Sequence, residues 1–324
     1  MPRGEENTAF IAHNRYMRTG SDIAIASAYG DALGAPYEFI PVVMPPDPVV
    51  MTSNGTWALG EWTDDTAMSV PILEASALGL ELSSPEAQGY IFRRWMDWAL
   101  VTKDIGNQTS RVIRNVRARI LPAHDDARVA DTARYYAAQV YERSGSKGNG
   151  SLMRTHAVAI ALRDRADEEI AAVARSISAL THPGEECEEA CVIWAVGIVH
   201  ALRGEVAIEA GLAQIPEKSR ERWLSVLNDD ADRDLMPWDF ENSGYVVDAL
   251  RAAWSAVSAA DDTRSCIDLA VRTDDSDTVA AIAGAFAGAL WGTDSLPADE
   301  VSILHGYPDL GGADLADLAE RTRG

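Results

Sequence analysis

Apolar residues recur along most of this chain at intervals of three and four positions, the spacing that places them on one face of an α-helix. The segments with this pattern are rich in Ala and Leu and cover residues 15–34, 65–80, 85–101, 108–120, 127–143, 151–163, 166–180, 185–203, 242–258 and 276–291. Alternation of apolar and polar residues, which is typical of strands, is almost absent. Its best example, Val42 to Met51, is interrupted by Pro45, Pro46 and Pro48 and is predicted to be an extended loop. The pattern therefore predicts an all-α protein.

Two of these helices stand out because small residues occupy most of their faces. They cover residues 23–34 and 279–291, and we expect both to be buried and closely approached by their neighbours. The long irregular pieces are residues 144–150 and the acidic stretch 228–241, and neither has the composition of a hinge. A single domain over residues 1–324 is the simplest interpretation.

Composition narrows the classes of function. The chain is 47% hydrophobic and 24% charged, as in globular proteins, and its net charge is −22. Such an acidic surface argues against nucleic acid as a partner, except as a modified substrate, since phosphates require a basic stripe. There is neither a signal-peptide pattern nor a stretch long enough to span a membrane, and Cys187, Cys191 and Cys266 are interpreted as buried reduced thiols. We expect a cytoplasmic protein, and a monomer because no exposed apolar stripe stands out.

Two oxygen-rich clusters precede apolar helices far apart in the sequence. They are residues 63–66 (Thr-Asp-Asp-Thr) and 273–278 (Thr-Asp-Asp-Ser-Asp-Thr). Helix capping accounts for one or two residues of each cluster. The remaining carboxylates would repel one another unless a cation lay among them, and the helix dipole offsets only part of that repulsion. Because neither His nor Cys lies nearby in the sequence, hard cations such as Mg²⁺, Mn²⁺ or Ca²⁺ are favoured over zinc.

Three further features could carry chemistry, and each has a structural alternative. Glu38 follows a helix stop at Gly34 and Pro36 and would by default be a solvated loop acid. Residues 148–154 (GNGSLMR) place glycines before a helix, where backbone N–H groups can bind an anion, although many helix entries look similar. His182 lies at a helix junction, where a packing or capping role is more common than catalysis.

Taken together, these segments resemble the ADP-ribosylglycohydrolase family. The matching pieces span nearly the whole chain and are GDALGAPYEF (30–39), WTDDTAM (62–68), GNGSLMR (148–154), THP (181–183) and DDSDTVAAIAGAFAGALWG (274–292). The resemblance implies a compact, orthogonal multi-helix bundle with a central cleft that holds two Mg²⁺ or Mn²⁺ ions. The implied metal ligands are Thr63, Asp64, Asp65, Asp275, Asp277 and Thr278.

The resemblance also implies a reaction, hydrolysis of the bond between ADP-ribose and a protein side chain or another acceptor. The implied proton acceptor is Glu38, Asp64 or Asp65, and the implied ADP-ribose contacts are Asn149, Gly150, Ser151, Met153 and His182. One departure is Asp274, which stands where the family usually has Gly or Asn and could crowd the diphosphate or alter metal preference. Two alternatives remain: a different ribosyl or ADP-ribosyl substrate, and a crystallin-like member that binds ADP-ribose without cleaving it.

Overall fold

The computed structural model describes residues 18–38, 40–205, 208–241 and 243–322, and this part of the chain is almost entirely helical. Its helices are α2 (Gly20–Gly34), α3 (Asp64–Ala77), α4 (Pro85–Trp98), α5 (Asn107–Arg117), α6 (Asp126–Ser144), α7 (His156–Ala161), α8 (Asp167–Ser178), α9 (Glu185–Leu202), α10 (Ile208–Ala213), α11 (Glu217–Asp232), the 3₁₀ turn η1 (Pro237–Asp239), α12 (Val246–Ala259), α13 (Thr263–Ala270), α14 (Ser276–Trp291), α15 (Ala298–Ser302) and α16 (Gly312–Arg321). Strands β1 (His305–Gly306) and β2 (Leu310–Gly311) form a small antiparallel hairpin.

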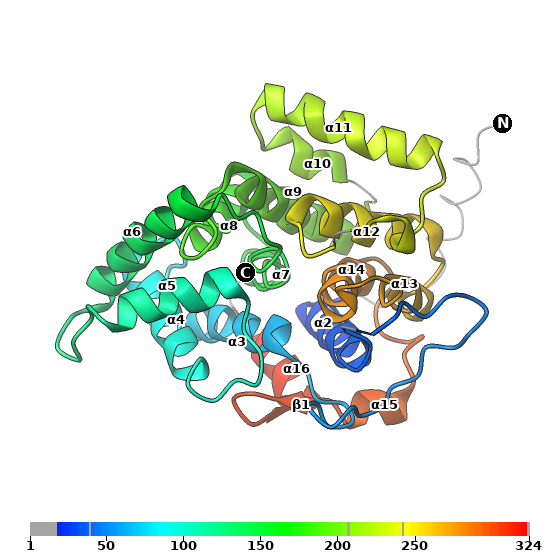
Figure 1. Cartoon of the computed structure of the whole chain (residues 1–324), viewed down its shortest axis with the longest axis horizontal. Coiled ribbons are helices and arrows are strands. Elements are labelled where there is room, and N and C mark those ends of the chain that lie inside the picture. Colours follow the sequence, from blue (N-terminus) through cyan, green and yellow to red (C-terminus); the bar gives the residue numbers. More distant parts are fainter. Residues whose placement is uncertain (1–17, 39, 206–207, 242, 323–324) are drawn as a thin grey trace.

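The helices cross at steep angles around a common core. In Figure 1, α2, α7 and α14 are seen nearly end-on in the middle of the molecule, whereas α6, α11 and α12 run across the view. This arrangement confirms the predicted all-α, orthogonal multi-helix bundle. Among the described residues, no helix combines the length and the apolar character needed to cross a membrane.

Helices α2 and α14 form the centre of the bundle and contact each other backbone to backbone. A Cβ atom at Gly30 would lie 2.3 Å from the carbonyl oxygen of Ala280, and one at Gly284 would lie 2.5 Å from that of Ala26. Only glycine allows this approach, since each of these distances is far shorter than a van der Waals contact. The buried, closely approached character predicted for residues 23–34 and 279–291 is therefore confirmed.

Each predicted helical segment contains a helix within its described residues; residues 15–17 and 242 of the predicted segments lie outside them. Helices α10, α11, α13, α15 and α16 were not among the predicted segments, and two further differences concern individual segments. Within residues 151–163, only His156–Ala161 is helical, because the chain first makes consecutive turns through residues 150–155. The stretch 228–241 was predicted to be irregular, yet its first part belongs to α11. In the preceding turns of α11, Trp223 and Leu227 lie one helical turn apart and are buried, a short apolar face that the surrounding charges hide in the sequence.

Candidate metal centre

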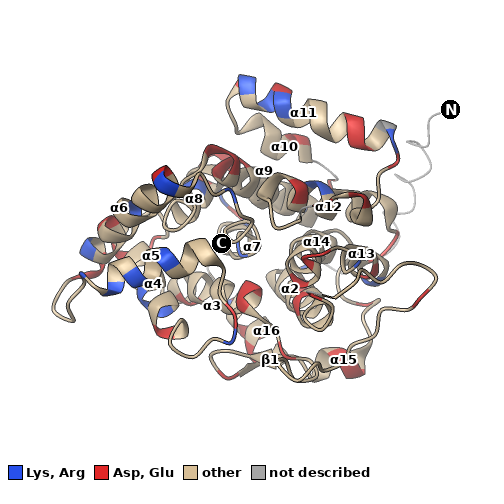
Figure 2. Cartoon of the chain, in the orientation of Figure 1, with Lys and Arg blue, Asp and Glu red and all other residues tan. Residues whose placement is uncertain are grey.

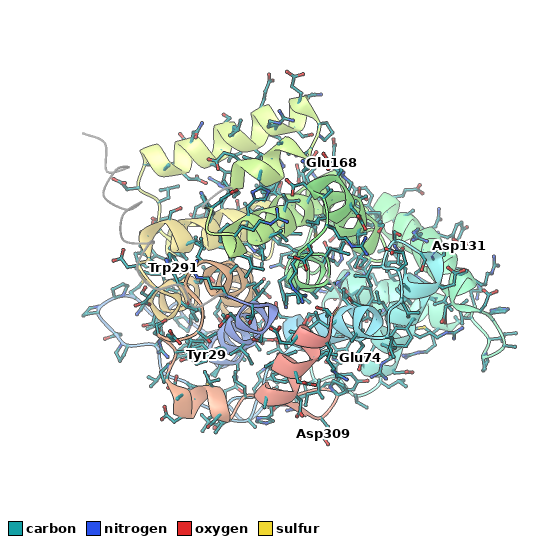
Figure 3. All side chains as sticks on the ribbon, turned by 180° about the vertical axis from the view of Figure 1, so that it is seen from behind. Tyr29, Glu74, Asp131, Glu168, Trp291 and Asp309 are labelled. Carbon is teal, nitrogen blue, oxygen red and sulfur yellow. The ribbon has the colours of Figure 1, made fainter. Side chains whose placement is uncertain are left out.

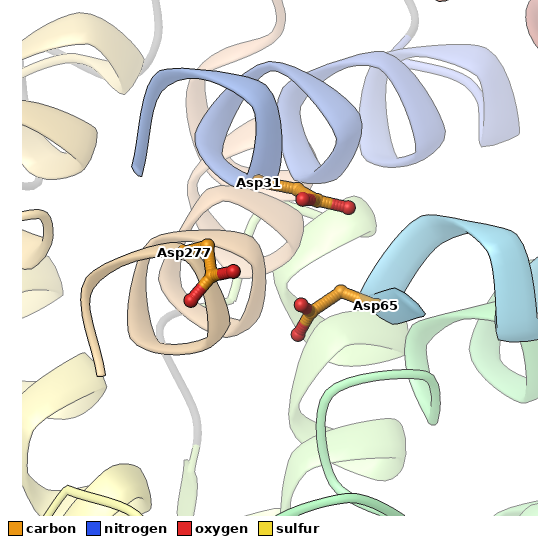
Figure 4. A group of neighbouring side chains, drawn as sticks. All are labelled: Asp31, Asp65 and Asp277. Atoms are coloured by element: carbon orange, nitrogen blue, oxygen red, sulfur yellow. The ribbon is translucent and has the colours of Figure 1, made fainter. Parts of the chain in front are cut away.

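Three aspartates from three helices converge at the middle of the molecule. Asp31 lies in the last turn of α2, while Asp65 and Asp277 lie in the first turns of α3 and α14. Their side chains point toward one another (Figure 4), and one carboxylate oxygen of each lies within 4.8 Å of the others. All three are buried, with exposed fractions of 0%, 0% and 3%. The two clusters that are about two hundred residues apart in the sequence thus form opposite walls of one site.

Asp31 holds the first cluster in place. Its Oδ1 atom accepts a hydrogen bond from the backbone N–H of Thr63 at 2.8 Å. Its Oδ2 atom accepts from the N–H of Thr66 at 3.0 Å and from the Thr66 hydroxyl at 2.6 Å. The backbone N–H groups of Thr63 and Thr66 lie at the start of α3 and have no acceptor within that helix. Asp31 therefore caps α3 from another helix, α2. Sequence reasoning gave Asp31 no role, although a carboxylate among the small apolar residues 23–34 is an available signal.

Thr63 links the two walls. Its hydroxyl lies 3.0 Å from Oδ2 of Asp65 and 3.3 Å from Oδ2 of Asp277, and with one hydrogen it can donate to only one of them at a time. The other oxygen of Asp65, Oδ1, is buried and has no hydrogen-bond partner among the described residues. A buried carboxylate oxygen without a donor is costly, and a bound cation is one way to satisfy it.

A second group of carboxylates lies nearer the solvent. Oxygens of Glu38, Asp275 and Asp277 fall within 4.8 Å of one another, and the first two side chains are half-buried. Asp64, adjacent to the buried Asp65, is also half-buried. Asp277 belongs to both groups, so the arrangement has a deep part and an outer part joined by a shared carboxylate. Thr278, the last of the predicted ligands, donates its backbone N–H to Oδ1 of Asp277 at 2.9 Å.

The electrostatics of the site favour a cation. Burial, and next the charge of Asp275, raises the pKa of Glu38 to about 8. Burial, followed by the charge of Asp104, raises the pKa of Asp64 to about 8. Burial and neighbouring carboxylates also raise the pKa of Asp65 well above its ordinary value. In the part of the chain that the structure describes, none of these side chains, nor Asp31, Asp275 or Asp277, lies within 4 Å of a Lys, Arg or His nitrogen.

The donor set fits a hard divalent cation. Within these two groups the ligands are carboxylates, and the nearby side chains add threonine hydroxyls. Magnesium and manganese prefer such oxygen ligands. Oxygens on opposite sides of a Mg²⁺ ion lie roughly 4 Å apart, which is compatible with both groups, whose oxygens all lie within 4.8 Å of one another. The residues therefore fit the metal that the family resemblance implies.

The glycine-rich loop lies against the outer group. The Asn149 side chain donates through Nδ2 to Oδ2 of Asp275 at 2.7 Å and to the backbone oxygen of Ser243 at 2.9 Å. Among the described residues, the backbone N–H groups of Gly150 and Ser151 have no acceptor. Two such neighbouring donors suit an anionic oxygen.

Behind this loop lies a buried polar chain. Arg154 donates to the backbone oxygen of Gly150 at 2.8 Å and to the Thr181 hydroxyl at 2.6 Å, and that hydroxyl lies 2.7 Å from Nδ1 of His182. The imidazole packs against Gly150, where a Cβ atom would be only 3.0 Å from the ring. Burial, together with the charge of Arg154, lowers the pKa of His182 to about 3, so the ring is neutral at physiological pH.

The predicted ADP-ribose contacts therefore fall into two sets. The Asn149 side chain contacts the outer group and Gly150 follows it in the loop, whereas the side chains of Ser151, Met153 and His182 are 2%, 3% and 3% exposed. The Ser151 hydroxyl accepts a hydrogen bond from Ser178 at 2.9 Å. In this structure these three side chains pack beneath the loop rather than lining an open surface.

Asp274 turns away from the carboxylate groups. Its side chain is exposed and accepts hydrogen bonds from the backbone N–H and the hydroxyl of Ser243, and that hydroxyl oxygen in turn lies 3.0 Å from the N–H of Asp275. Here Asp274 ties the second cluster to the chain segment that also contacts Asn149. This arrangement makes it a support of the loop rather than an additional ligand.

Comparisons with known proteins agree with this geometry. Residues 22–324 match the family model for ADP-ribosylglycohydrolase. The ADP-ribosylarginine hydrolase Tri1 of Pseudomonas putida (strain GB-1) is 29% identical over 290 residues, which cover 85% of this chain and 71% of that protein. The ADP-ribosyl-[dinitrogen reductase] glycohydrolase of Rhodospirillum rubrum is 29% identical over 297 residues, covering 86% and 87%. A solved structure described as an ADP-ribosylglycohydrolase-related protein complex superposes with a TM-score of 0.70 at 25% identity, covering 94% of this chain and 96% of that one.

Proposed function

Because this chain belongs to the ADP-ribosylglycohydrolase family, we propose that it hydrolyses the bond between ADP-ribose and an arginine side chain of a modified protein. The observation that carries the proposal is the hydrogen bond between Asn149 and Asp275. It joins the carboxylate groups to a loop with backbone donors, so candidate groups for holding cations, a sugar and a diphosphate lie next to one another. Relatives named for arginine and dinitrogen reductase substrates support a protein acceptor.

The acidic centre would hold two Mg²⁺ or Mn²⁺ ions. The deep group offers one ion the carboxylates of Asp31, Asp65 and Asp277, and the outer group offers the second ion those of Asp275 and Asp277, with Glu38 beside them as a candidate proton acceptor. The proposed ligands, with Asp31 added to the sequence-based set, are Asp31, Thr63, Asp64, Asp65, Asp275, Asp277 and Thr278. When bound, such ions orient ribose hydroxyls and lower the pKa of coordinated water.

The protein's own groups then have distinct tasks. Hydrolysis forms a bond between a water oxygen and the anomeric carbon of the ribose, and it breaks the bond from that carbon to the guanidino nitrogen. The water loses a proton to a carboxylate, and the leaving nitrogen gains one. We assign the proton-accepting role to Glu38 or Asp64, which are half-buried at the outer side of the centre. Asp65 is fully buried beneath Thr63 and suits a ligand role better.

The loop would hold the rest of the substrate. The N–H groups of Gly150 and Ser151 would donate to a phosphate oxygen, which their lack of an acceptor among the described residues supports. His182 and Met153 are buried and would support the loop. They would contact the adenosine end of the substrate only after a shift of the loop. An anion site built from backbone donors suits a chain whose net charge is −22.

The direct test is release of ADP-ribose from a peptide that carries one ADP-ribosylated arginine, with Mg²⁺ or Mn²⁺ supplied. We expect Asp277→Asn to reduce turnover at least a hundredfold, because Asp277 is shared by both groups. Asp299→Asn, which removes an exposed carboxylate on α15, is the matched control and should keep full activity. Tight binding of ADP-ribose without cleavage of arginine-linked substrate would instead identify a non-catalytic binder and refute the proposal.

A further inference from the structure

The one strongly basic region of this acidic chain surrounds α5. Residues 105–124 contain Arg111, Arg114, Arg117 and Arg119 and no Asp or Glu. The longer segment 107–144 contains seven Arg and four Asp or Glu. Its net charge is therefore +3, and that of the rest of the chain is −25. Figure 2 shows the blue segments gathered on α5 and α6 at the left of the view. Charge is thus strongly polarised across the molecule.

These arginines are exposed and lack carboxylate partners. Arg111, Arg114, Arg119 and Arg128 are exposed, and among the described residues none of them has a carboxylate oxygen within 4 Å. The spacing of three between Arg111, Arg114 and Arg117 places them on one face of α5. Like charges on neighbouring positions repel, so the cluster adds nothing to the stability of the helix. We call residues 111, 114, 117, 119 and 128 the arginine face.

The arginine face continues into a cavity with aromatic walls. A surface cavity of about 380 Å³ lies between the end of α5 and the first turns of α6, and it is lined by Arg119, Arg128, Asp131, Thr132, Tyr135 and Tyr136. The rings of Tyr135 and Tyr136 meet edge to face, with centroids 5.1 Å apart, and Tyr135 is 60% exposed. Asp131 marks this region at the outer edge of the molecule in Figure 3. Arg and Tyr together are the residues most enriched where proteins bind one another.

The arginine face begins close to the candidate site. Gln108, in the first turn of α5, donates to the backbone oxygen of Thr181 at 2.7 Å, and the Thr109 hydroxyl lies 3.8 Å from a Cβ position built at Gly150. Arg111 follows about one helical turn later, and Arg119 lies roughly 12 Å beyond it along the helix direction. A protein whose modified residue enters the cleft would therefore extend over α5.

We propose that the arginine face docks an acidic segment of the ADP-ribosylated protein, beside its modified residue. This inference rests on the proposed function and adds a partner chemistry to it. The residues outside 107–144 sum to a net charge of −25, so the arginine face is the approach that electrostatic attraction favours for an acidic polypeptide. A long nucleic-acid backbone would extend beyond this small face onto acidic surface, whereas a short Asp/Glu-rich segment would not.

The test uses two peptides of equal length, each with one ADP-ribosylated arginine, followed by a Glu-rich or a Gln-rich segment. The face variant carries Arg111→Glu, Arg114→Glu and Arg119→Glu. A control with the same change in net charge carries Arg165→Glu, Arg233→Glu and Arg321→Glu, at exposed arginines on other helices or turns. A second face variant carries Gln at the same three positions. It removes the positive charges without adding negative ones, so it keeps the test valid if the Glu variant fails to fold.

We expect the wild type to favour the Glu-rich peptide by about tenfold in kcat/KM at low ionic strength, with the preference falling as salt is added. The face variants should lose this preference and still cleave free ADP-ribosylarginine normally, while the control keeps it. Equal rates on both peptides, or a preference that survives in the face variants, would overturn the inference.

Failure of the proposed function gives a different result. In that case the wild type cleaves neither peptide nor free ADP-ribosylarginine, and direct titration with the unmodified Glu-rich peptide decides about docking. Binding to the wild type and not to the face variants supports the docking surface. Absence of binding, or tighter binding of an oligonucleotide of equal charge, overturns the assignment to an acidic polypeptide.

Discussion

Without divalent cations, this protein should become less stable as pH rises. The reason is that its centre buries carboxyl groups, and these lose their protons at higher pH. Burial raises the pKa of Asp31 from 3.8 to about 6, although hydrogen bonds from Thr66 and Thr63 limit the rise. A carboxyl group whose pKa is raised by folding binds protons more tightly in the folded state. The free energy of unfolding therefore falls as pH rises from the pKa of the group in the unfolded state to its pKa in the folded state.

The magnitude follows from the size of that shift. For Asp31, which is fully buried, a shift of about two pH units corresponds to about 3 kcal/mol, lost between roughly pH 4 and pH 6. Glu38 and Asp64, whose pKa values rise to about 8, extend the loss toward pH 8, with smaller contributions because solvent reaches both side chains. Since whole domains are stable by about 5–15 kcal/mol, this is a large fraction of the total.

The assay is urea unfolding followed by tryptophan fluorescence, in the presence of a chelator, at about pH 5 and about pH 8. We expect a lower free energy of unfolding at the higher pH, restored by excess Mg²⁺ or Mn²⁺, because a ligand that binds only the folded state stabilises it. Asp65→Asn should reduce the pH dependence, and Asp299→Asn should leave it unchanged. A free energy of unfolding that does not fall over this range would refute the reasoning.

Three further predictions test the surroundings of the centre. Gly284→Ala should lower the free energy of unfolding by about 1–3 kcal/mol by forcing α2 and α14 apart, whereas Gly106→Ala, where a Cβ atom meets nothing within 4 Å, should be nearly neutral in the same melts. Asn149→Asp places a second carboxylate beside Asp275 and should raise KM for the ADP-ribosylated peptide about tenfold or more, as measured by steady-state kinetics. Arg154→Lys keeps the charge and loses the paired contacts to the loop, so it should weaken ADP-ribose binding in calorimetry while circular dichroism stays native.

The helical period was sufficient to predict most of the long helices, with α11 (Glu217–Asp232) the exception, and local chemistry was sufficient to predict the two acidic clusters. Residues 63–66 and 273–278 contain more carboxylates than capping needs, and that excess is visible without any structure. The short helices were harder to predict. In α13, for example, eight residues bury only Thr263, Cys266, Ile267 and Ala270, too few positions for a periodic pattern to emerge.

What the sequence could not predict depends on how helices approach one another. Asp31 is one carboxylate in a helix of small residues, and its capping of α3 exists only because α2 lies beside Thr63 and Thr66. In the same way, nothing local indicates that the Ser151 side chain points inward to Ser178 while its backbone N–H is left without an acceptor among the described residues. Both facts concern the direction of a side chain relative to another element, which periodicity leaves open.

The close packing of α2 on α14 explains why so much negative charge can be held together. A Cβ atom at Gly34 would lie 2.4 Å from Cα of Asp277, so the absence of a side chain there lets the start of α14 approach the end of α2. This contact fixes the Asp277 backbone beside the turn that carries Asp31, and the Ser276 hydroxyl strengthens it by donating to the backbone oxygen of Gly34 at 3.0 Å. Apolar burial along the two helices offsets carboxylate repulsion that would otherwise drive them apart. The position of these carboxylates is thus set by the core, so substitutions along this helix pair should alter affinity for the proposed metal ions even where they contact none of the proposed ligands.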